Sequence, residues 1–209
     1  MNAPFPIAVL ISGGGTTLRN LLVKQQAGEL PVDIRLVISS NPTAAGLEFA
    51  RQANIKTIIV EKTKRTDADA YSNAIFRPCR EAGVQLVVMG GFLKHVAIPP
   101  DFTNRVINIH PSLIPAFCGQ GMYGHFVHEA VLAYGAKVSG CTIHFVDNDF
   151  DRGPIVLQRV VPVLDDDTPS TLAARVFAAE CEALPDAIRL FAYGRLSLSG
   201  RIVHIAGEE

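Results

Sequence analysis

The 209-residue sequence lacks an excess of charge of one sign, a long apolar run and closely spaced cysteines. Charged residues make up 19% of the chain and the formal net charge is -1, so no basic field exists to hold nucleic acid or anionic lipid. No apolar run approaches the ~20 residues that span a bilayer, and no basic and apolar leader opens the chain. We therefore expect a cytoplasmic protein, monomer or homodimer, whose partners are small molecules and neither nucleic acid nor a membrane.

The four cysteines lie too far apart in sequence to suggest a zinc ribbon, a dithiol redox site or a disulfide framework. Free, partly buried thiols are expected at all four positions. They are Cys79, Cys118, Cys141 and Cys181.

Apolar runs alternate with helix-like stretches through the first half of the chain. Residues 7–11 form an unbroken apolar run, which a glycine turn and a helix-like stretch over 18–26 follow. This order opens a doubly wound sheet, and it predicts an α/β fold with a mostly parallel twisted sheet flanked by helices, in one domain over residues 1–209. Further strands are expected over 34–38, 57–60, 86–89, 105–109, 139–146 and 155–161, and further helices over 44–53, 67–82, 125–133 and 171–192.

The glycine turn after the first strand is a candidate anion site. Glycines let the backbone approach a ligand closely, and the following helix directs unpaired N–H groups at the turn. The spacing matches neither the dinucleotide pattern nor the nucleoside-triphosphate loop, and a tight turn without ligand stays the alternative. The candidate residues are Gly13, Gly14, Gly15, Thr16 and Thr17.

Polar residues in the second half of the chain form a second candidate site. Asn108 and His110 lie two apart in an expected strand, so their side chains share a face. A hydrogen-bonded pair in a polar turn is the plainer interpretation of these two residues. The loop that ends at Asp151 gathers three carboxylates after an apolar strand, a costly arrangement that favours a functional role.

The sequences Asn-Ile-His-Pro-Ser-Leu-Ile-Pro (108–115), His-Phe-Val (144–146) and Asp-x-Gly-Pro-Ile (151–155) together resemble the signature of the phosphoribosylglycinamide formyltransferase family. The resemblance implies the formyltransferase fold, with a Rossmann-like N-terminal half that binds a phosphorylated substrate and a C-terminal half that binds folate. It implies transfer of the formyl group of 10-formyltetrahydrofolate to 5-phosphoribosylglycinamide (glycinamide ribonucleotide), a step of purine biosynthesis that gives tetrahydrofolate.

The same resemblance assigns roles to single residues. It implies that Asn108, His110 and Asp151 are catalytic, that Gly15, Thr16 and Thr17 bind the substrate phosphate, and that Glu180 lies near the sugar. The residues implied for folate binding are Leu93, Lys94, His95, Val96, Asn108, Val146 and Asp147.

This sequence departs from the family pattern at three places. Thr17 stands where asparagine is common, and Ala68 stands where an arginine often helps to hold the substrate, so that Lys64 or Arg65 is expected to substitute. A longer loop over 116–125 replaces the usual short Pro-Gly-Leu-His segment. Its contacts with substrate are left open.

The remaining histidines give weak signals. His125 and His128 can meet on one helix face beside Glu129, but no third ligand has a matching spacing, so we expect no metal. His144 is expected to be packed rather than catalytic. His204 is expected on the surface of a short tail.

The expected chemistry is attack of an amine on the formyl carbon. Asn108 donates an N–H to the developing oxyanion, and His110, held protonated by Asp151, adds a second donor. Asp151 accepts the ammonium proton and returns it to the folate nitrogen.

Other enzymes that use formyl folate remain alternatives: a formyl-folate hydrolase, or a formyltransferase acting on initiator methionyl-tRNA or a nucleotide sugar. Chain length is expected to separate them, because the hydrolase adds an N-terminal regulatory domain and the tRNA enzyme a C-terminal barrel. A phosphate-binding or nucleotide-binding module is the non-enzyme alternative, but it leaves the three candidate catalytic residues without a task.

Overall fold

The computed structural model describes residues 3–207. These residues form two compact units, one ending at Asn108 and the other beginning at Ile109. The boundary falls inside a single strand, β5 (Val106–His110). The one domain expected over 1–209 stays a prediction.

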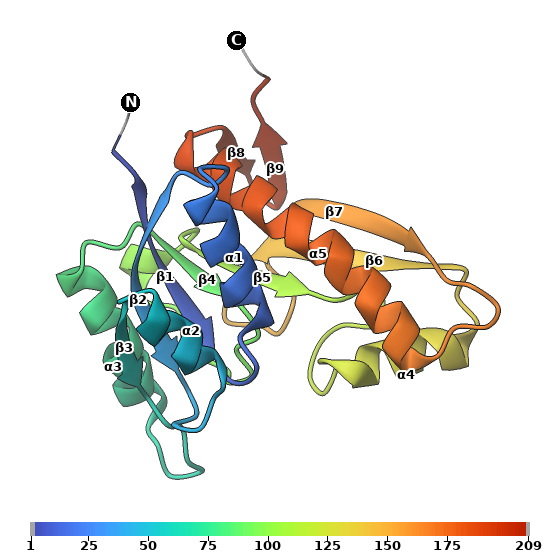
Figure 1. Cartoon of the computed structure of the whole chain (residues 1–209), viewed down its shortest axis with the longest axis horizontal. Coiled ribbons are helices and arrows are strands. Elements are labelled where there is room, and N and C mark those ends of the chain that lie inside the picture. Colours follow the sequence, from blue (N-terminus) through green and yellow to red (C-terminus); the bar gives the residue numbers. More distant parts are fainter. Residues whose placement is uncertain (1–2, 208–209) are drawn as a thin grey trace. The chain divides into compact units, whose positions relative to one another are not determined.

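The first unit is a parallel sheet with helices (Figure 1). Its strands follow the order β3-β2-β1-β4-β5, and every pairing among them is parallel. Ile7 and its neighbours up to Ile11 are 0% exposed, as expected for a central strand buried on both faces. The elements are β1 (Phe5–Ile11), α1 (Thr16–Gln26), β2 (Val32–Ser39), α2 (Gly46–Gln52), β3 (Lys56–Ile59), α3 (Ala68–Glu81), β4 (Leu86–Met89) and a 3₁₀ turn (Pro100–Phe102).

The strand order dictates which helices share a face of this sheet. From β1 to β3 the chain moves toward one edge, and it then returns across the sheet to β4. Because crossovers between parallel strands are right-handed, α1 and α2 lie on one face and α3 on the other (Figure 1). The carboxyl ends of β1, β4 and β5 therefore lie at one edge, where open α/β sheets bind ligands.

The second unit contains an antiparallel pair of strands covered by a long helix. Strands β6 and β7 are antiparallel, and α5 packs along them (Figure 1). The hydrogen-bonded order of the whole sheet is β3-β2-β1-β4-β5-β6-β7, so the mostly parallel α/β sheet expected from the sequence is confirmed. The elements are α4 (His125–Tyr134), β6 (Val138–Phe145), β7 (Ile155–Pro162), α5 (Pro169–Ala192), β8 (Leu196–Ser199) and β9 (Ile202–Ile205).

The start of α5 is fixed by its own side chains. The Thr168 hydroxyl accepts a hydrogen bond from the Thr171 N–H, and the Thr171 hydroxyl accepts one from the Thr168 N–H. Asp167, just before the helix, forms an ion pair with Arg175, which lies about one helical turn after Thr171. The capping box explains why an acidic and Thr-rich stretch directly precedes the helix.

A two-stranded hairpin, β8–β9, forms the tail after α5, where none of the strands expected from the sequence lies. Leu-Ser-Leu-Ser alternates apolar and polar residues before Gly200, which has φ 60°, and the mostly apolar Ile-Val-His-Ile follows Arg201. That alternation next to a glycine is a hairpin signal, but each strand is only four residues long. His204 is exposed, as expected.

Two further features concern the described chain as a whole. Within residues 3–207 no helix is both long enough and apolar enough to cross a membrane. All four cysteines are free, with Cys79 and Cys141 buried, which confirms the expectation of unpaired thiols.

Gly46→Ala is predicted to destabilise the fold, because α2 touches the glycine turn at this residue. A Cβ at position 46 would lie 2.7 Å from the Gly15 Cα and 2.9 Å from the Ile11 Cδ1. We expect a loss of about 1–3 kcal/mol in the free energy of unfolding, measured by chemical denaturation. Gly14→Ala is the control, since a Cβ there meets nothing within 4 Å; equal losses in both variants would contradict the packing argument.

Candidate active site

The glycine turn connects the end of β1 to the start of α1. Gly15 has φ 72° and precedes the first helical residue without offering a capping side chain, so the first-turn N–H groups of α1 are available to an anion. The start of α2 fixes the turn, because the Gly46 N–H donates to the Gly13 carbonyl oxygen at 3.1 Å. Gly13, Gly14 and Thr16 are exposed, which suits contact with a ligand.

The Ser12 hydroxyl links this turn to the second candidate loop of the first unit. The Leu93 N–H donates to Ser12 Oγ at 2.9 Å, and Ser12 Oγ lies 2.6 Å from Ser40 Oγ. Residue-type reasoning singled out neither serine. The available signal was a serine directly after each of two parallel strands, at the edge where ligands bind.

Residues 93–96 form the loop for which the family resemblance implies folate binding. Leu93, Lys94 and His95 are exposed and accessible to a ligand, whereas Val96 is buried. Side-chain donors fix the loop: Lys62 Nζ donates to the His95 carbonyl at 2.6 Å, and Ser72 Oγ donates to the Ala97 carbonyl at 2.6 Å.

Asp151 lies between two buried histidines in the second unit. Its Oδ2 is 3.6 Å from His110 Nδ1, and its Oδ1 is 3.6 Å from His144 Nε2. The two imidazoles are 3% and 2% exposed. The Gly119 N–H donates to Asp151 Oδ2 at 2.8 Å, which is the direct hydrogen bond that anchors this carboxylate.

Backbone carbonyls determine where each imidazole carries its proton. His110 Nε2 is 2.9 Å from the Phe117 carbonyl oxygen, and His144 Nδ1 is 2.8 Å from the Phe145 carbonyl oxygen. A carbonyl only accepts, so each of these nitrogens donates. The ring nitrogens that face Asp151 therefore carry a proton only when their ring is charged.

Burial and neighbouring charge act on the pKa values of this cluster. Burial lowers the pKa of His110, and it outweighs the opposing effects of Asp151 and of the Phe117 hydrogen bond. Burial raises the pKa of Asp151, but His144, His110 and the Gly119 N–H together bring it below its ordinary value. The carboxylate is thus favoured in its charged form and His110 in its neutral form, which differs from the protonated ring expected above.

Asn108 is the third member of the expected catalytic set. It is half-buried, pairs in register with Met89 across β4 and β5, and lies two residues before His110 in the same strand. The period of two along a strand gives the two side chains one face, as expected. Their roles in catalysis stay predictions.

Comparison with known proteins decides the family. Residues 6–188 match the family described as formyl transferase. The chain is also 34% identical over 206 residues to the phosphoribosylglycinamide formyltransferase of Haemophilus influenzae, covering 97% of this chain and 94% of that one. This chain belongs to the formyl transferase family. The resemblance inferred from the motifs at 108–115 and 144–155 is confirmed.

Two further relatives bear on the extent of the match to the formyl transferase family. Glycinamide ribonucleotide transformylase 1 of Symbiobacterium toebii, a solved structure, is 40% identical with a TM-score of 0.90, covering 99% of this chain and 96% of that one. The chloroplastic phosphoribosylglycinamide formyltransferase of Arabidopsis thaliana is 39% identical over 177 residues, which are 83% of this chain and 61% of that protein. This chain thus spans less than two thirds of that plant relative.

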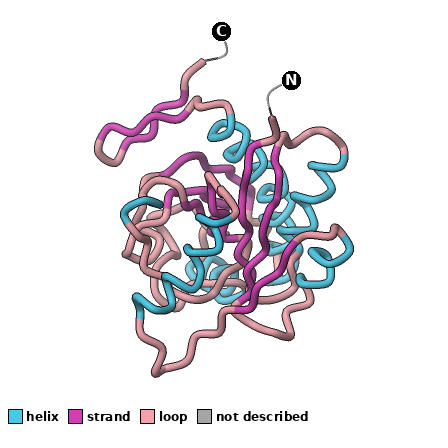
Figure 2. Tube along the Cα trace, turned by 90° about the vertical axis from the view of Figure 1, so that its left-hand side faces the viewer, coloured by secondary structure: helices cyan, strands magenta, loops and turns pink. Residues whose placement is uncertain are grey.

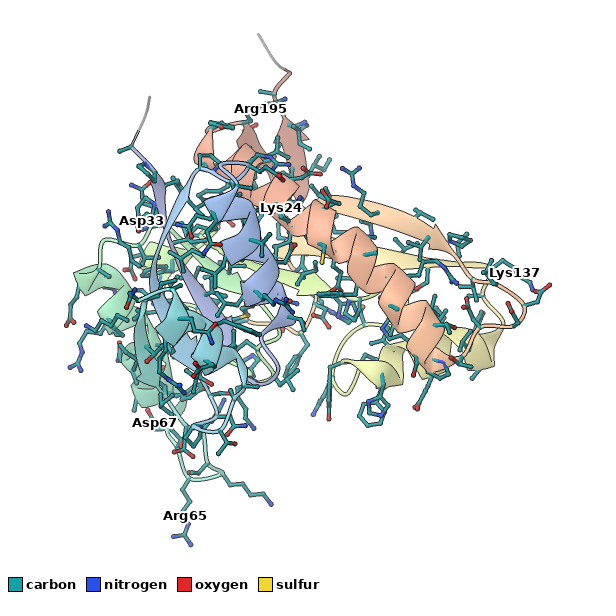
Figure 3. All side chains as sticks on the ribbon, in the orientation of Figure 1. Lys24, Asp33, Arg65, Asp67, Lys137 and Arg195 are labelled. Carbon is teal, nitrogen blue, oxygen red and sulfur yellow. The ribbon has the colours of Figure 1, made fainter. Side chains whose placement is uncertain are left out.

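The remaining residues expected to bind folate or substrate differ in their exposure to solvent. Val146 and Asp147 are half-buried at the start of the acidic loop, and Asp147 Oδ1 accepts from the Asp149 N–H at 3.0 Å. Lys64 and Arg65, proposed substitutes for an arginine near Ala68, are exposed, and Arg65 points outward from its loop (Figure 3).

The histidine pair on α4 does not assemble a metal site. His128 is 4% exposed and its Nδ1 has no hydrogen-bond partner among the described residues, whereas His125 is exposed and packs against Phe126. Among residues 3–207, no three His, Cys, Asp or Glu side chains are grouped to hold a metal ion. The expectation of a metal-free reaction stays a prediction.

Glu180→Gln is predicted to stabilise the protein at neutral and alkaline pH. Glu180 is half-buried on α5, and burial raises its pKa from 4.5 to about 7. Below pH 4.5 the Glu180 carboxyl is protonated in both the folded and the unfolded state and carries no penalty. As pH rises through 7, burying the charged carboxylate lowers the free energy of unfolding. The variant should therefore match the wild type near pH 4.5 and exceed it by about 2 kcal/mol above pH 8, measured by denaturation across pH. The same exchange at exposed Glu182 controls for the charge; parallel pH curves for wild type and Glu180→Gln would rule out the burial argument.

Proposed function

We propose that this chain transfers the formyl group of 10-formyltetrahydrofolate to the amine of 5-phosphoribosylglycinamide. The products are formylglycinamide ribonucleotide and tetrahydrofolate, in purine biosynthesis. One observation carries the proposal: the mostly buried carboxylate of Asp151 lies between the buried imidazoles of His110 and His144, and His110 ends a strand that also bears the Asn108 amide. Membership of the formyl transferase family and relatives named for this reaction support it.

The phosphorylated substrate has a binding element of the right chemistry in the first unit. A phosphate accepts hydrogen bonds from the first-turn N–H groups of α1 and gains from the positive end of its dipole. Gly13, Gly14 and Gly15 let the backbone approach, and the Thr16 and Thr17 hydroxyls add donors. Glu180, in the second unit, is proposed to accept hydrogen bonds from sugar hydroxyls.

The folate is proposed to bind through the backbone of residues 93–96, with Asn108, Val146 and Asp147 as further contacts. A flat heterocycle with donors and acceptors on its edge suits a loop whose side chains are partly turned outward. Leu93 is 57% exposed, so it offers apolar area to the ring.

In the proposed reaction the amine attacks the formyl carbon and the formyl oxygen gains negative charge. The Asn108 amide N–H and the His110 Nε2–H are the proposed donors to this oxygen, each worth about 3 kcal/mol in a site without water. In the structure the His110 Nε2–H donates its hydrogen bond to the Phe117 carbonyl. The substrate oxygen must therefore replace that carbonyl, which requires residues around Phe117 to move.

Asp151 is proposed to take the proton that the attacking nitrogen loses. Its lowered pKa keeps it charged and ready to accept, and the two flanking imidazoles share the added proton. The proton then passes to the folate nitrogen as its bond to the formyl carbon breaks. Charge and atoms balance without a metal ion or a covalent enzyme intermediate.

A formyl-folate hydrolase is the enzyme alternative, because water can replace the amine beside the same carboxylate. The two functions differ in product: formate for the hydrolase and a formylated amine for the transferase. A phosphate-binding or nucleotide-binding module would give neither product. Cytoplasmic location and a monomeric or homodimeric state remain predictions.

Asp151→Asn is predicted to abolish most formyl transfer while leaving substrate binding nearly intact. The amide keeps the shape but cannot accept the ammonium proton, so kcat should fall about 10³-fold with KM values changed less than about threefold. Release of tetrahydrofolate, followed by absorbance with both substrates, measures this. Asp149→Asn, an exposed acid of the same loop, should keep the wild-type rate; near-normal turnover in Asp151→Asn would disprove the assigned role.

Ser12→Ala and Ser72→Ala are predicted to have different effects on the KM values of the two substrates. Ser12 touches the 93–96 loop and adjoins the glycine turn, whereas Ser72 holds only the Ala97 carbonyl. Loss of one hydrogen bond is worth about a three- to tenfold change in KM. We expect Ser12→Ala to raise KM for both substrates and Ser72→Ala to raise it for the folate alone. Steady-state kinetics with each substrate varied will show whether the two patterns differ.

A further inference from the structure

The hairpin β8–β9 has no task in the proposed function. It lies beyond residues 6–188, the part that matches the formyl transferase family. Figure 2 shows it as the two short strands next to the C-terminal end. Its tip nevertheless makes one polar contact of consequence: Arg201 Nη2 donates to the carbonyl oxygen of Arg152, the residue that directly follows Asp151.

The backbone at Asp151 needs such support. Asp151 has φ 54°, in the left-handed region that side chains other than glycine rarely adopt. A backbone in this region costs free energy and persists only where several contacts fix it together. A loop freed of those contacts would relax and carry the Asp151 carboxylate with it.

The far end of the acidic loop is fixed independently. The Phe145 N–H donates to the Pro154 carbonyl at 2.8 Å, and a Cβ at Gly153 would lie 1.7 Å from the Phe145 carbonyl oxygen. Gly153 is therefore pressed against the end of β6. Between this anchor and Asp151 lies the Arg152 peptide, whose carbonyl is the group that Arg201 holds.

We propose that Arg201 is a positioning residue for Asp151: by holding the Arg152 carbonyl it keeps the carboxylate between His110 and His144. This inference rests on the proposed function, in which Asp151 accepts a proton. Arginine suits the task because its guanidinium is always charged and presents several donors in a fixed plane. Arg201, on the exposed hairpin tip, can thus fix the position of the mostly buried Asp151 side chain.

Loss of the contact has a predictable electrostatic effect. Within the described part of the second unit, the ionisable groups facing Asp151 are His110 of β5, His144 of β6 and Cys118 of the adjoining loop, and Arg152 acts in turn on Cys118. Burial raises the Asp151 pKa, and the two histidines and the Gly119 N–H lower it. If the carboxylate drifts from these partners its pKa rises, so the acid limb of the pH–rate profile moves to higher pH.

The test compares Arg201→Met with Arg201→Lys. Methionine keeps an aliphatic chain without donors, and we expect kcat to fall about tenfold with both KM values within about twofold, because a small misplacement of a reacting group is costly. Lysine restores a charged donor and should recover most of the rate. The acid limb should shift upward in Arg201→Met and return in Arg201→Lys.

Arg35→Met is the matched control. Arg35 is likewise an exposed arginine whose Nη1 donates to a backbone carbonyl, that of Ala82, at 2.8 Å, but it lies in the first unit. It should lower the melting temperature at most and leave kcat unchanged. If both arginine variants lose kcat in proportion to melting temperature, the role of Arg201 is merely structural and the proposal fails.

A readout that needs no activity separates this inference from the proposed function. The Gly119 N–H donates to Asp151, so its hydrogen exchange, followed by NMR, should accelerate in Arg201→Met and not in Arg35→Met. Unchanged Gly119 exchange together with unchanged kcat in Arg201→Met overturns the inference. A wild-type protein that transfers no formyl group overturns the proposed function instead, and Gly119 exchange still decides whether Arg201 positions Asp151.

Discussion

The contact on which the candidate site depends is the one between the Asp151 carboxylate and the two imidazoles on either side of it. A buried carboxylate is costly unless donors compensate it, and here the Gly119 N–H is the direct donor, with both rings at 3.6 Å. His110 and His144 each direct one ring nitrogen at a backbone carbonyl and the other at Asp151. The carboxylate thus has an imidazole on either side, an arrangement that suits the proton acceptor of the proposed reaction.

Much of the frame around this cluster could be predicted from the sequence because burial on both faces leaves a clear mark. The apolar run at 86–89 becomes β4 with the expected bounds, and the run at 7–11 becomes β1, which begins two residues earlier. The shared face of Asn108 and His110 follows from the period of two along a strand. The proximity of His110 to Asp151, which lie 41 positions apart by their numbers, came only through the family resemblance, since no local pattern encodes it.

Contacts made by backbone groups and the effect of burial on pKa values could not be predicted from the sequence. The Phe117 carbonyl and the Gly119 N–H contact His110 and Asp151, yet a peptide group has the same chemistry in every residue. The direction of the His110 pKa was missed for a related reason: the carboxylate was visible in the sequence, whereas the burial that outweighs it was not. The hairpin was missed because strands of four residues give too short an alternation to stand out.

The unfavourable local features of the second unit gather around the same few residues. Phe117 and Asp151 have positive φ, the His128 Nδ1 is buried without a partner among the described residues, and burial raises the Glu180 pKa to about 7. Each feature lowers stability, and none is needed to complete the sheet. Local choices that conflict with the fold are expected where function constrains the sequence. Phe117 contacts His110, Asp151 lies beside it, and His110 is near enough to lower the pKa of His128. Three of these four features therefore adjoin one imidazole, which supports, independently of any relative, the proposal that function constrains this part of the chain.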